Sequence, residues 1–392
     1  MRRFALIIII LTLSCVFAHA QEFTATLSEE RVTVPDEPNR VGLQMVKRSL
    51  MFGPAAIRYQ QLVDPKQHDA PVVQRYADYT LGLDFPRYTW NWDLEYFLSV
   101  TVTRPGQEPV NTTRAVLQEG MYILQQGPRV MADMVWPLPP APGRPAAKMA
   151  VRLIALADDP QWLYLRAGVE GDPEAKISEV RLHSYPTTTS GPPERQRWVT
   201  TLTRSVQMGS AVAPLQPAEE WGLVMHNRMA QEEGGTLLVM DPREIKSVGA
   251  VGVYPIEVQM QTEGVSEVHV AMGYFRETPW QKAVDSFRQA APERLKRLQA
   301  LDWTAPVDLA GWQKHKQEVE ELLKLTPASA TEFGPEWASV LAHADEALKR
   351  LAATPGDSAA ARNFVLLNRQ ARDLKSRLYE PALKALIEQA TR

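Results

Sequence analysis

The chain has 392 residues and a formal net charge of −3, from 43 Lys and Arg against 46 Asp and Glu. This mildly acidic balance, without a long basic run, argues against a nucleic-acid-binding protein. A hydrophobic content of 45% with scattered charges is typical of a folded globular protein rather than a disordered one.

Residues 1–20 have the pattern of a cleaved export signal. Two arginines precede the apolar run Phe4–Leu13, and Ala18–Ala20 forms a small-x-small cleavage site. The apolar run is shorter than the roughly 20 residues that a membrane-spanning helix needs. We therefore expect export to the periplasm or the medium after cleavage near Ala20, with no integral membrane segment afterwards.

Cys15 lies inside this signal and is the only cysteine of the chain. The alternative interpretation is a lipoprotein acylated at Cys15, but of the three preceding residues only Ser14 fits a lipobox, because Thr12 and Leu13 do not. We favour ordinary cleavage. The mature chain would then have no thiol, which excludes disulfides, thiolate catalysis and cysteine-ligated metals.

From residue 21 to residue 276 the apolar residues recur with a period of two, and turn residues are frequent. Val151–Leu156 and Trp162–Leu165, for example, predict a hairpin. Because no helical stretch long enough for a crossover intervenes, we expect a mainly β domain, a large antiparallel β-sandwich with a supersandwich-like arrangement as a variant. The proline-rich segment 136–145 is a possible sub-boundary, although we favour a stiff loop within one sandwich.

After this domain the apolar period changes to 3.6, which predicts a connecting helix within residues 277–302 and a helical bundle over residues 303–392. The apolar residues that recur on one face of each helix, together with the prolines, predict the helix boundaries. We expect the connecting helix to be interrupted at Pro292, one bundle helix over Leu309–Leu325, a second starting at Gly334 and a third that is kinked or ended by Pro381.

The segment Tyr88–Val100 is rich in aromatic side chains and alternates strictly. This alternation predicts a long strand continuing to Thr103, with most of the rings in the core. Asp93 and Glu95 fall on the opposite face together with Phe97, the one apolar exception. These three are ligand-binding candidates if that face lines a concave groove.

Histidines supply the catalytic candidates. His226 opens the polar stretch HNRMAQEE, which also contains Arg228, Glu232 and Glu233. An imidazole, a guanidinium and two carboxylates are the groups that acid/base chemistry on a sugar requires, although a solvated hairpin tip has the same composition. His183, with Arg181 on the same strand face, and His269 are further candidates.

No metal or cofactor is expected. The closest approach to a metal-ligand pair is Glu267 with His269, and the sequence contains neither His-x-His nor two histidines four residues apart. Nucleophile-elbow, phosphate-loop, zincin and EF-hand motifs are also absent from the sequence.

Three functions remain open. The first is an exported, non-catalytic binding protein, whose sandwich recognises a carbohydrate or protein ligand and whose helices dock to a partner. The second is a carbohydrate-active enzyme of the epimerase or lyase type that uses the His/Glu/Arg cluster. The third is a structural component of the cell envelope, with an envelope protein as its partner. An exported all-β domain of this size is similar to sandwich and supersandwich folds of carbohydrate-handling proteins, a likeness that identifies no site. The oligomeric state is left open.

Overall fold

The computed structural model describes residues 23–34, 40–53, 55–73, 75, 78–84, 92–93, 96–185, 197–228, 234–252, 255–325 and 327–391. The predicted export signal, Glu95, Glu232 and Glu233 lie outside these residues. The chain divides into two compact units between Leu301 and Asp302. With 41% strand and 31% helix, the fold is mainly β with large antiparallel sheets followed by helices, which confirms the predicted fold class.

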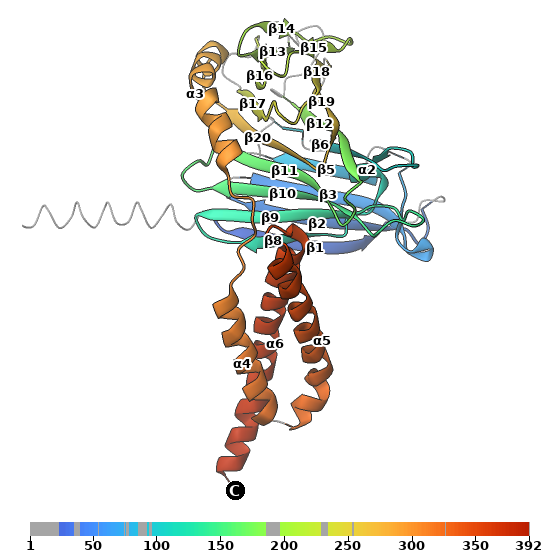
Figure 1. The fold of residues 1–392 in the computed structure, drawn as a ribbon, viewed down its shortest axis with the longest axis vertical. Helices are drawn as coiled ribbons and strands as arrows, with labels where there is room; N and C mark the ends of the chain where they lie inside the picture. Colours follow the sequence, from blue (N-terminus) through green and yellow to red (C-terminus); the bar gives the residue numbers. More distant parts are fainter. Residues whose placement is uncertain are drawn as a thin grey trace, which may run out of the picture. The chain divides into compact units, whose positions relative to one another are not determined.

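Three antiparallel sheets make up the first unit (Figure 1). The five-stranded sheet has the order β1 (Ala25–Thr33), β2 (Gln44–Phe52), β3 (Ala55–Asp64) and β4 (Ala70–Pro71), with β5 (Tyr79–Asp84) also paired to β3. The nine-stranded sheet has the order β14 (Ser205–Gln207), β13 (Arg197–Thr201), β16 (Gly222–Asn227), β17 (Gly235–Met240), β20 (Glu267–Phe275), β11 (Trp162–Glu170), β10 (Lys148–Leu156), β9 (Arg129–Pro137) and β8 (Gly120–Gln125). The six-stranded sheet has the order β15 (Ala213–Leu215), β18 (Ser247–Val251), β19 (Ile256–Val265), β12 (Lys176–Ser184), β6 (Leu98–Thr103) and β7 (Val110–Asn111).

The core of this unit is one apolar cluster to which all three sheets contribute. Leu50 of the five-stranded sheet, Leu153 of the nine-stranded sheet and Leu182 of the six-stranded sheet are all buried in it. Because side chains alternate along a strand, each sheet turns its other face away from this core.

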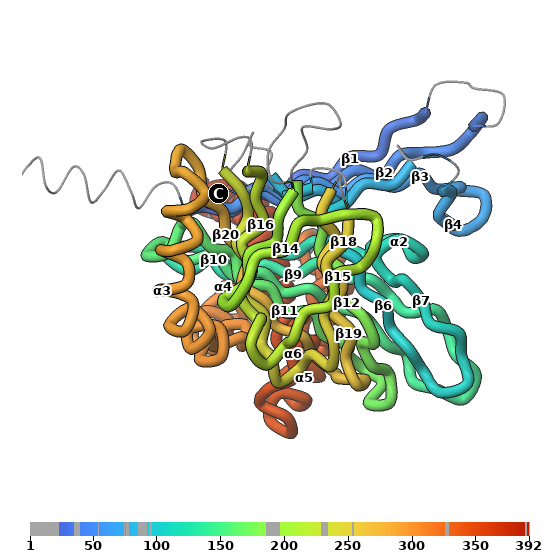
Figure 2. Tube along the Cα trace, turned by 90° about the horizontal axis from the view of Figure 1, so that it is seen from above, coloured from blue at the N-terminus to red at the C-terminus, as the bar shows by residue number. Residues whose placement is uncertain are grey.

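The proline-rich segment 136–145 spans the end of β9 and the connection to β10, and these two strands pair along their length, with Lys148 opposite Pro137. The connection therefore joins two neighbouring strands of one sheet. Figure 2, viewed from above, shows β12, β6 and β7 following one another toward one side of the unit, whereas α3 (Trp280–Ala300) lies on the opposite side.

The long strand predicted from Tyr88 is wrong in its described part. Regular pairing starts only at Leu98, while Trp92 and Tyr96 form isolated bridges to Ser184 and Leu81. The Asp93 carboxylate accepts a hydrogen bond from the Tyr96 backbone N–H at 3.0 Å, a local contact that competes with regular strand pairing. Trp92 is nevertheless fully buried, and its indole N–H donates to the Gly273 carbonyl at 3.1 Å.

Helix α3 closes the first unit and packs on β16, β17 and β20 (Figure 1). Its buried face includes Val284 and Phe287, and the Phe287 ring stacks on Trp162 of β11 with the centroids 6.4 Å apart. Contrary to the prediction, Pro292 does not interrupt this helix. A proline removes one backbone donor, but burial of neighbouring side chains such as Ala291 holds the helix together.

The second unit consists of α4 (Leu309–Leu325), α5 (Pro327–Ala353) and α6 (Ser358–Ala390). The bounds of α4 are as predicted, whereas α5 begins before Gly334 and α6 continues through Pro381. The buried side chains Leu378 and Ala382, on either side of Pro381, keep α6 in place. No helix of the described ranges is long and apolar enough to cross a membrane.

Candidate functional site

The outer face of the six-stranded sheet carries a regular array of polar side chains. On β12, Val180 and Leu182 point into the core, so that the residues between and beside them point outward. β19 repeats this pattern around the buried Val258 and Met260. Six outward residues, here called the β12–β19 polar face, are Glu179, Arg181, His183, Glu257, Gln259 and Gln261.

The strand register arranges these residues as three cross-strand pairs. Glu179 lies opposite Gln261, Arg181 opposite Gln259, and His183 opposite Glu257. Side chains directly opposite each other on one face of an antiparallel pair are close enough to interact. The sheet thus positions carboxylates, amides, a guanidinium and an imidazole without help from any loop.

Hydrogen bonds join these pairs into a lattice. The Arg181 guanidinium is 2.8 Å from a Glu179 oxygen and 3.3 Å from Glu257 Oε1. The Gln259 amide donates to Glu257 Oε1 at 2.5 Å, and the Gln261 amide donates to Glu179 Oε1. The hydrogen bond to Glu179 raises the pKa of Arg181 above its ordinary value. With 39% of its side chain exposed, Arg181 is accessible to a ligand.

His183 closes one end of the lattice. Its Nε2 lies 3.3 Å from Glu257 Oε2, but within the described part of the chain it forms no hydrogen bond. The imidazole packs against the Tyr96 ring at a centroid distance of 5.1 Å. Burial lowers the pKa of His183 below 6.5 more than the charges of Glu257 and Asp93 raise it. At neutral pH the site therefore contains a neutral imidazole next to a carboxylate.

Asp93 adjoins this site but does not face solvent. Its backbone N–H donates to the His183 carbonyl at 3.2 Å, its carboxylate accepts from the Tyr96 N–H, and only 6% of the residue is exposed. Asp93 thus positions Tyr96 and His183. Phe97, predicted to line a groove, is instead fully buried in the core, directly before β6 begins at Leu98.

The structure thus brings together three residues singled out from the sequence: Arg181, His183 and Asp93. Sequence reasoning missed Glu257. The alternating stretch that begins at Ile256 contains the signal, since Glu257, Gln259 and Gln261 follow one another with a period of two. What the sequence could not give is that β19 is the neighbour of β12.

His226 lies on β16 of the nine-stranded sheet, and Arg228 follows the end of that strand. His226 is fully buried, its Nε2 is 2.9 Å from the Thr200 hydroxyl, and its ring stacks on Trp280 with the centroids 4.7 Å apart. Burial, followed by the charge of Arg228, lowers the pKa of His226 to about 3. This imidazole is a poor base at neutral pH.

His269 lies at a third place. Glu244 holds it through both the imidazole Nδ1 and the backbone N–H, each at 2.7 Å. His226 is opposite Gly235, which pairs with Phe275, and Phe275 is six positions from His269 along β20. At about 3.4 Å per residue the two histidines are roughly 20 Å apart. The three candidate histidines therefore do not converge on one site.

Metal binding at Glu267 and His269 has no further support. Glu267 Oε2 lies 3.8 Å from His269 Nε2. Within the part of the chain that the structure describes, no group of three or more His, Cys, Asp or Glu side chains could hold a metal ion.

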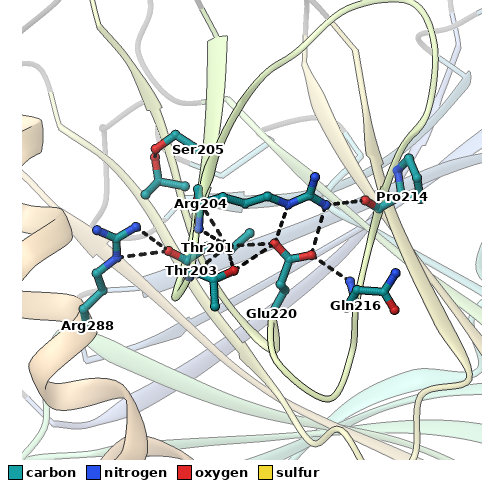
Figure 3. A network of polar contacts seen from close by, with 9 residues as sticks. Thr201, Thr203, Arg204, Ser205, Pro214, Gln216, Glu220 and Arg288 are labelled. Carbon is teal, nitrogen blue, oxygen red and sulfur yellow. Dashed lines mark hydrogen bonds and ion pairs between the residues drawn. The ribbon is translucent and has the colours of Figure 1, made fainter.

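Figure 3 shows a second polar network, centred on Glu220. The carboxylate accepts hydrogen bonds from Thr201 Oγ1 at 2.9 Å, Arg204 Nε at 2.7 Å and the Gln216 backbone N–H at 2.8 Å. Arg288 of α3 donates to the Thr201 carbonyl beside it. Because Glu220 is only 2% exposed and its oxygens are occupied by donors of the chain, we interpret this network as structural.

No protein-family model matches the chain, and no curated protein matches it. Two solved structures show a weak likeness. One is described as a kojibiose phosphorylase from human microbiome, with a TM-score of 0.33 and 10% identity over 64% of this chain and 32% of that chain. The other is galactose 1-epimerase from Lactobacillus acidophilus NCFM, with a TM-score of 0.31 and 9% identity over 64% of this chain and 99% of that chain. Likenesses at these scores assign no activity to this chain.

Proposed function

We propose that the protein binds a carbohydrate on the β12–β19 polar face. The observation that carries this proposal is the set of three cross-strand pairs of planar hydrogen-bonding groups. Each sugar hydroxyl both donates and accepts a hydrogen bond. The carboxylates of this face supply acceptors, the guanidinium supplies donors, and the two amides supply both.

The dimensions and the position of the face support this proposal. Positions two apart on a strand are roughly 6.6 Å apart, so the three pairs extend over roughly 13 Å, longer than one pyranose ring. The Tyr96 ring, packed against His183, adds an apolar surface at one end. We also propose that binding takes place outside the cytoplasm, in line with the export signal predicted for residues 1–20.

Titration calorimetry against a panel of neutral saccharides tests this proposal. We expect saturable binding of at least one saccharide, and Arg181→Met should weaken it at least tenfold because one residue supplies the lattice with its guanidinium donors. The matched control is Arg31→Met, which removes an exposed ion pair with Asp69 on the five-stranded sheet.

Thermal shift is a second readout, because a ligand at a hundred times its Kd adds about 2.7 kcal/mol of stability. If no saccharide of the panel binds, or if Arg181→Met binds as well as the wild type while circular dichroism shows both to be folded, the proposal fails. Co-purification from native envelopes would then test the structural role.

The His183–Glu257 pair favours a second candidate function, proton transfer on the bound sugar. A neutral imidazole can take up a proton, and the adjacent carboxylate stabilises the imidazolium that forms. The expected result is that His183→Asn abolishes turnover of a bound saccharide while its Kd stays within a few-fold. Because burial lowers the pKa of His183, activity should persist below pH 6.5. Binding without turnover by the wild type would exclude this enzymatic role.

A further inference from the structure

A second group of side chains, on the nine-stranded sheet, encloses an arginine. The guanidinium carbon of Arg228 lies 3.5 Å from the centroid of the Trp198 ring and 4.6 Å from that of Trp280. Trp198 is directly opposite His226 in the β13–β16 register, and Trp280 is the first residue of α3. These four residues are called the Trp–Arg–Trp cluster.

The charge of Arg228 has no counter-ion in the described part of the chain. No ion pair or hydrogen bond joins its half-buried side chain to any described residue, and burial lowers the pKa of Arg228 without opposition from a carboxylate. A partly buried cation is normally paired with an anion. The two indole rings stabilise it through cation–π contacts, which leave the in-plane N–H groups to bind something else.

Nitrogen atoms without partners gather around this cation. Within the described ranges, Trp198 Nε1, His226 Nδ1, Arg228 Nε and Trp280 Nε1 are all buried and form no hydrogen bond. Leaving a buried donor unpaired is unfavourable, and native proteins contain few such groups. Four in one cluster of contacting side chains therefore call for an explanation.

His226 fits a donor role in this cluster. It is fully buried, and its Nε2 is already engaged with the Thr200 hydroxyl, which also contacts Ser205 at 2.8 Å. When that hydroxyl donates to Nε2, the proton of the neutral ring is on Nδ1. Nδ1–H then joins the two indole N–H groups and the guanidinium as a donor. In this tautomer the cluster offers only donors and one positive charge.

We infer that the Trp–Arg–Trp cluster binds an oxyanion, such as a carboxylate, sulfate or phosphate group. A guanidinium donates hydrogen bonds to two oxygens of such a group side by side in a bidentate arrangement, and indole N–H groups donate to further oxygens. Among the described residues, no carboxylate acts on the pKa of His226 or Arg228, so none of these residues is seen to repel an anion from the cluster. This site is separate from the β12–β19 polar face, which belongs to the other sheet.

Titration of the full-length protein with sodium sulfate, inorganic phosphate, acetate and D-glucuronate at pH 7.5 tests the inference. Tryptophan fluorescence and calorimetry follow the binding, with sodium chloride as the ionic-strength control and D-glucose as the neutral counterpart of glucuronate. We expect saturable binding of an oxyanion, at least tenfold weaker in Arg228→Met and unchanged in Arg31→Met. Arg228→Lys should lose part of the affinity, because it keeps the charge without the planar fork.

Trp280→Phe keeps a stacked ring and removes one indole N–H, so it should weaken binding even if Arg228→Met does not fold. Preference for glucuronate over the three simple ions would identify the oxyanion as part of an acidic sugar, whereas equal responses would identify a free oxyanion. The inference is overturned if none of the four anions binds saturably, or if folded Arg228→Met and Trp280→Phe both bind like the wild type. Glucose and the neutral saccharides test the β12–β19 polar face separately.

Discussion

His226 should make the β unit less stable in mild acid. Its ring is fully buried, with one nitrogen on the Thr200 hydroxyl and one face on Trp280. Burial lowers the pKa of His226 from 6.5 to about 3 in the folded protein, so the imidazole remains neutral where an unfolded chain would protonate it. The unfolded state therefore binds more protons between these two values, and stability is lost as pH falls below 6.5.

The magnitude follows from the two pKa values of this group. Because the folded and unfolded states bind protons with these two pKa values, the free energy of unfolding should fall by about 2 kcal/mol from pH 8 to pH 5. Below pH 3 the loss should approach a limit of about 5 kcal/mol. The Arg228 charge acts in the same direction, because it disfavours a second positive charge nearby. His226→Gln removes the titration and keeps a group that can hydrogen bond to Thr200.

Urea unfolding at pH 8 and pH 5, followed by circular dichroism with the β transition analysed apart from the helical one, measures this effect. Between pH 8 and pH 5, the free energy of unfolding of the wild type should fall by about 2 kcal/mol more than that of His226→Gln. His343→Gln removes an exposed histidine of the second unit and serves as the control. Equal losses in the wild type and His226→Gln would refute the reasoning. So would an NMR imidazole signal that is absent from His226→Gln and titrates near pH 6.5 in the native wild type.

Two further predictions concern buried charges of the first unit. Asp133 and Arg152 form an ion pair at 2.7 Å, with at most 1% of either side chain exposed. In urea titrations, Asp133→Ala should lower the free energy of unfolding by about 3–5 kcal/mol, because it leaves the Arg152 charge buried without its partner. The double variant Asp133→Leu with Arg152→Met should recover most of this loss. A loss below about 1 kcal/mol for Asp133→Ala would contradict the uncompensated-charge argument. Burial alone would raise the pKa of Glu220, but hydrogen bonds from Arg204, the Gln216 backbone and Thr201 outweigh this effect and hold the pKa below its ordinary value. The stability that Glu220 contributes is therefore present at neutral pH and is lost as pH falls through the folded-state pKa. Glu220→Gln should cost about 1.5–3 kcal/mol at pH 7 and flatten this acid dependence in thermal melts, and an unchanged melt at pH 7 would show that the network contributes little.

Local patterns were sufficient to predict the elements but not all their ends. The 3.6-residue stripe gave the bounds of α4, because helix periodicity and the proline at its end are both local signals. It failed at Pro292, where burial of neighbouring side chains on the tertiary core outweighs the loss of one backbone hydrogen bond, and α6 likewise does not end at Pro381. The period-two alternation failed at Asp93, whose carboxylate accepts a hydrogen bond from the Tyr96 backbone N–H inside a stretch that alternates like a strand.

In the candidate sites too, local patterns predicted some features and only the tertiary structure decided the others. Alternation within β12 was enough to place Arg181 and His183 on one face, because the period of two is a property of the strand itself. That Glu257 lies opposite His183, and that Arg228 lies between Trp198 and Trp280, follows from strand pairing and helix docking.

The sequence by itself thus determined the fold class, the change from β to helical structure near residue 276 and the outward faces of strands. Only the tertiary structure decided which outward residues meet, and it separated three histidines that composition alone had grouped as candidates. The physical reason is that a strand specifies its two faces locally, whereas its neighbours are selected by burial of the shared core.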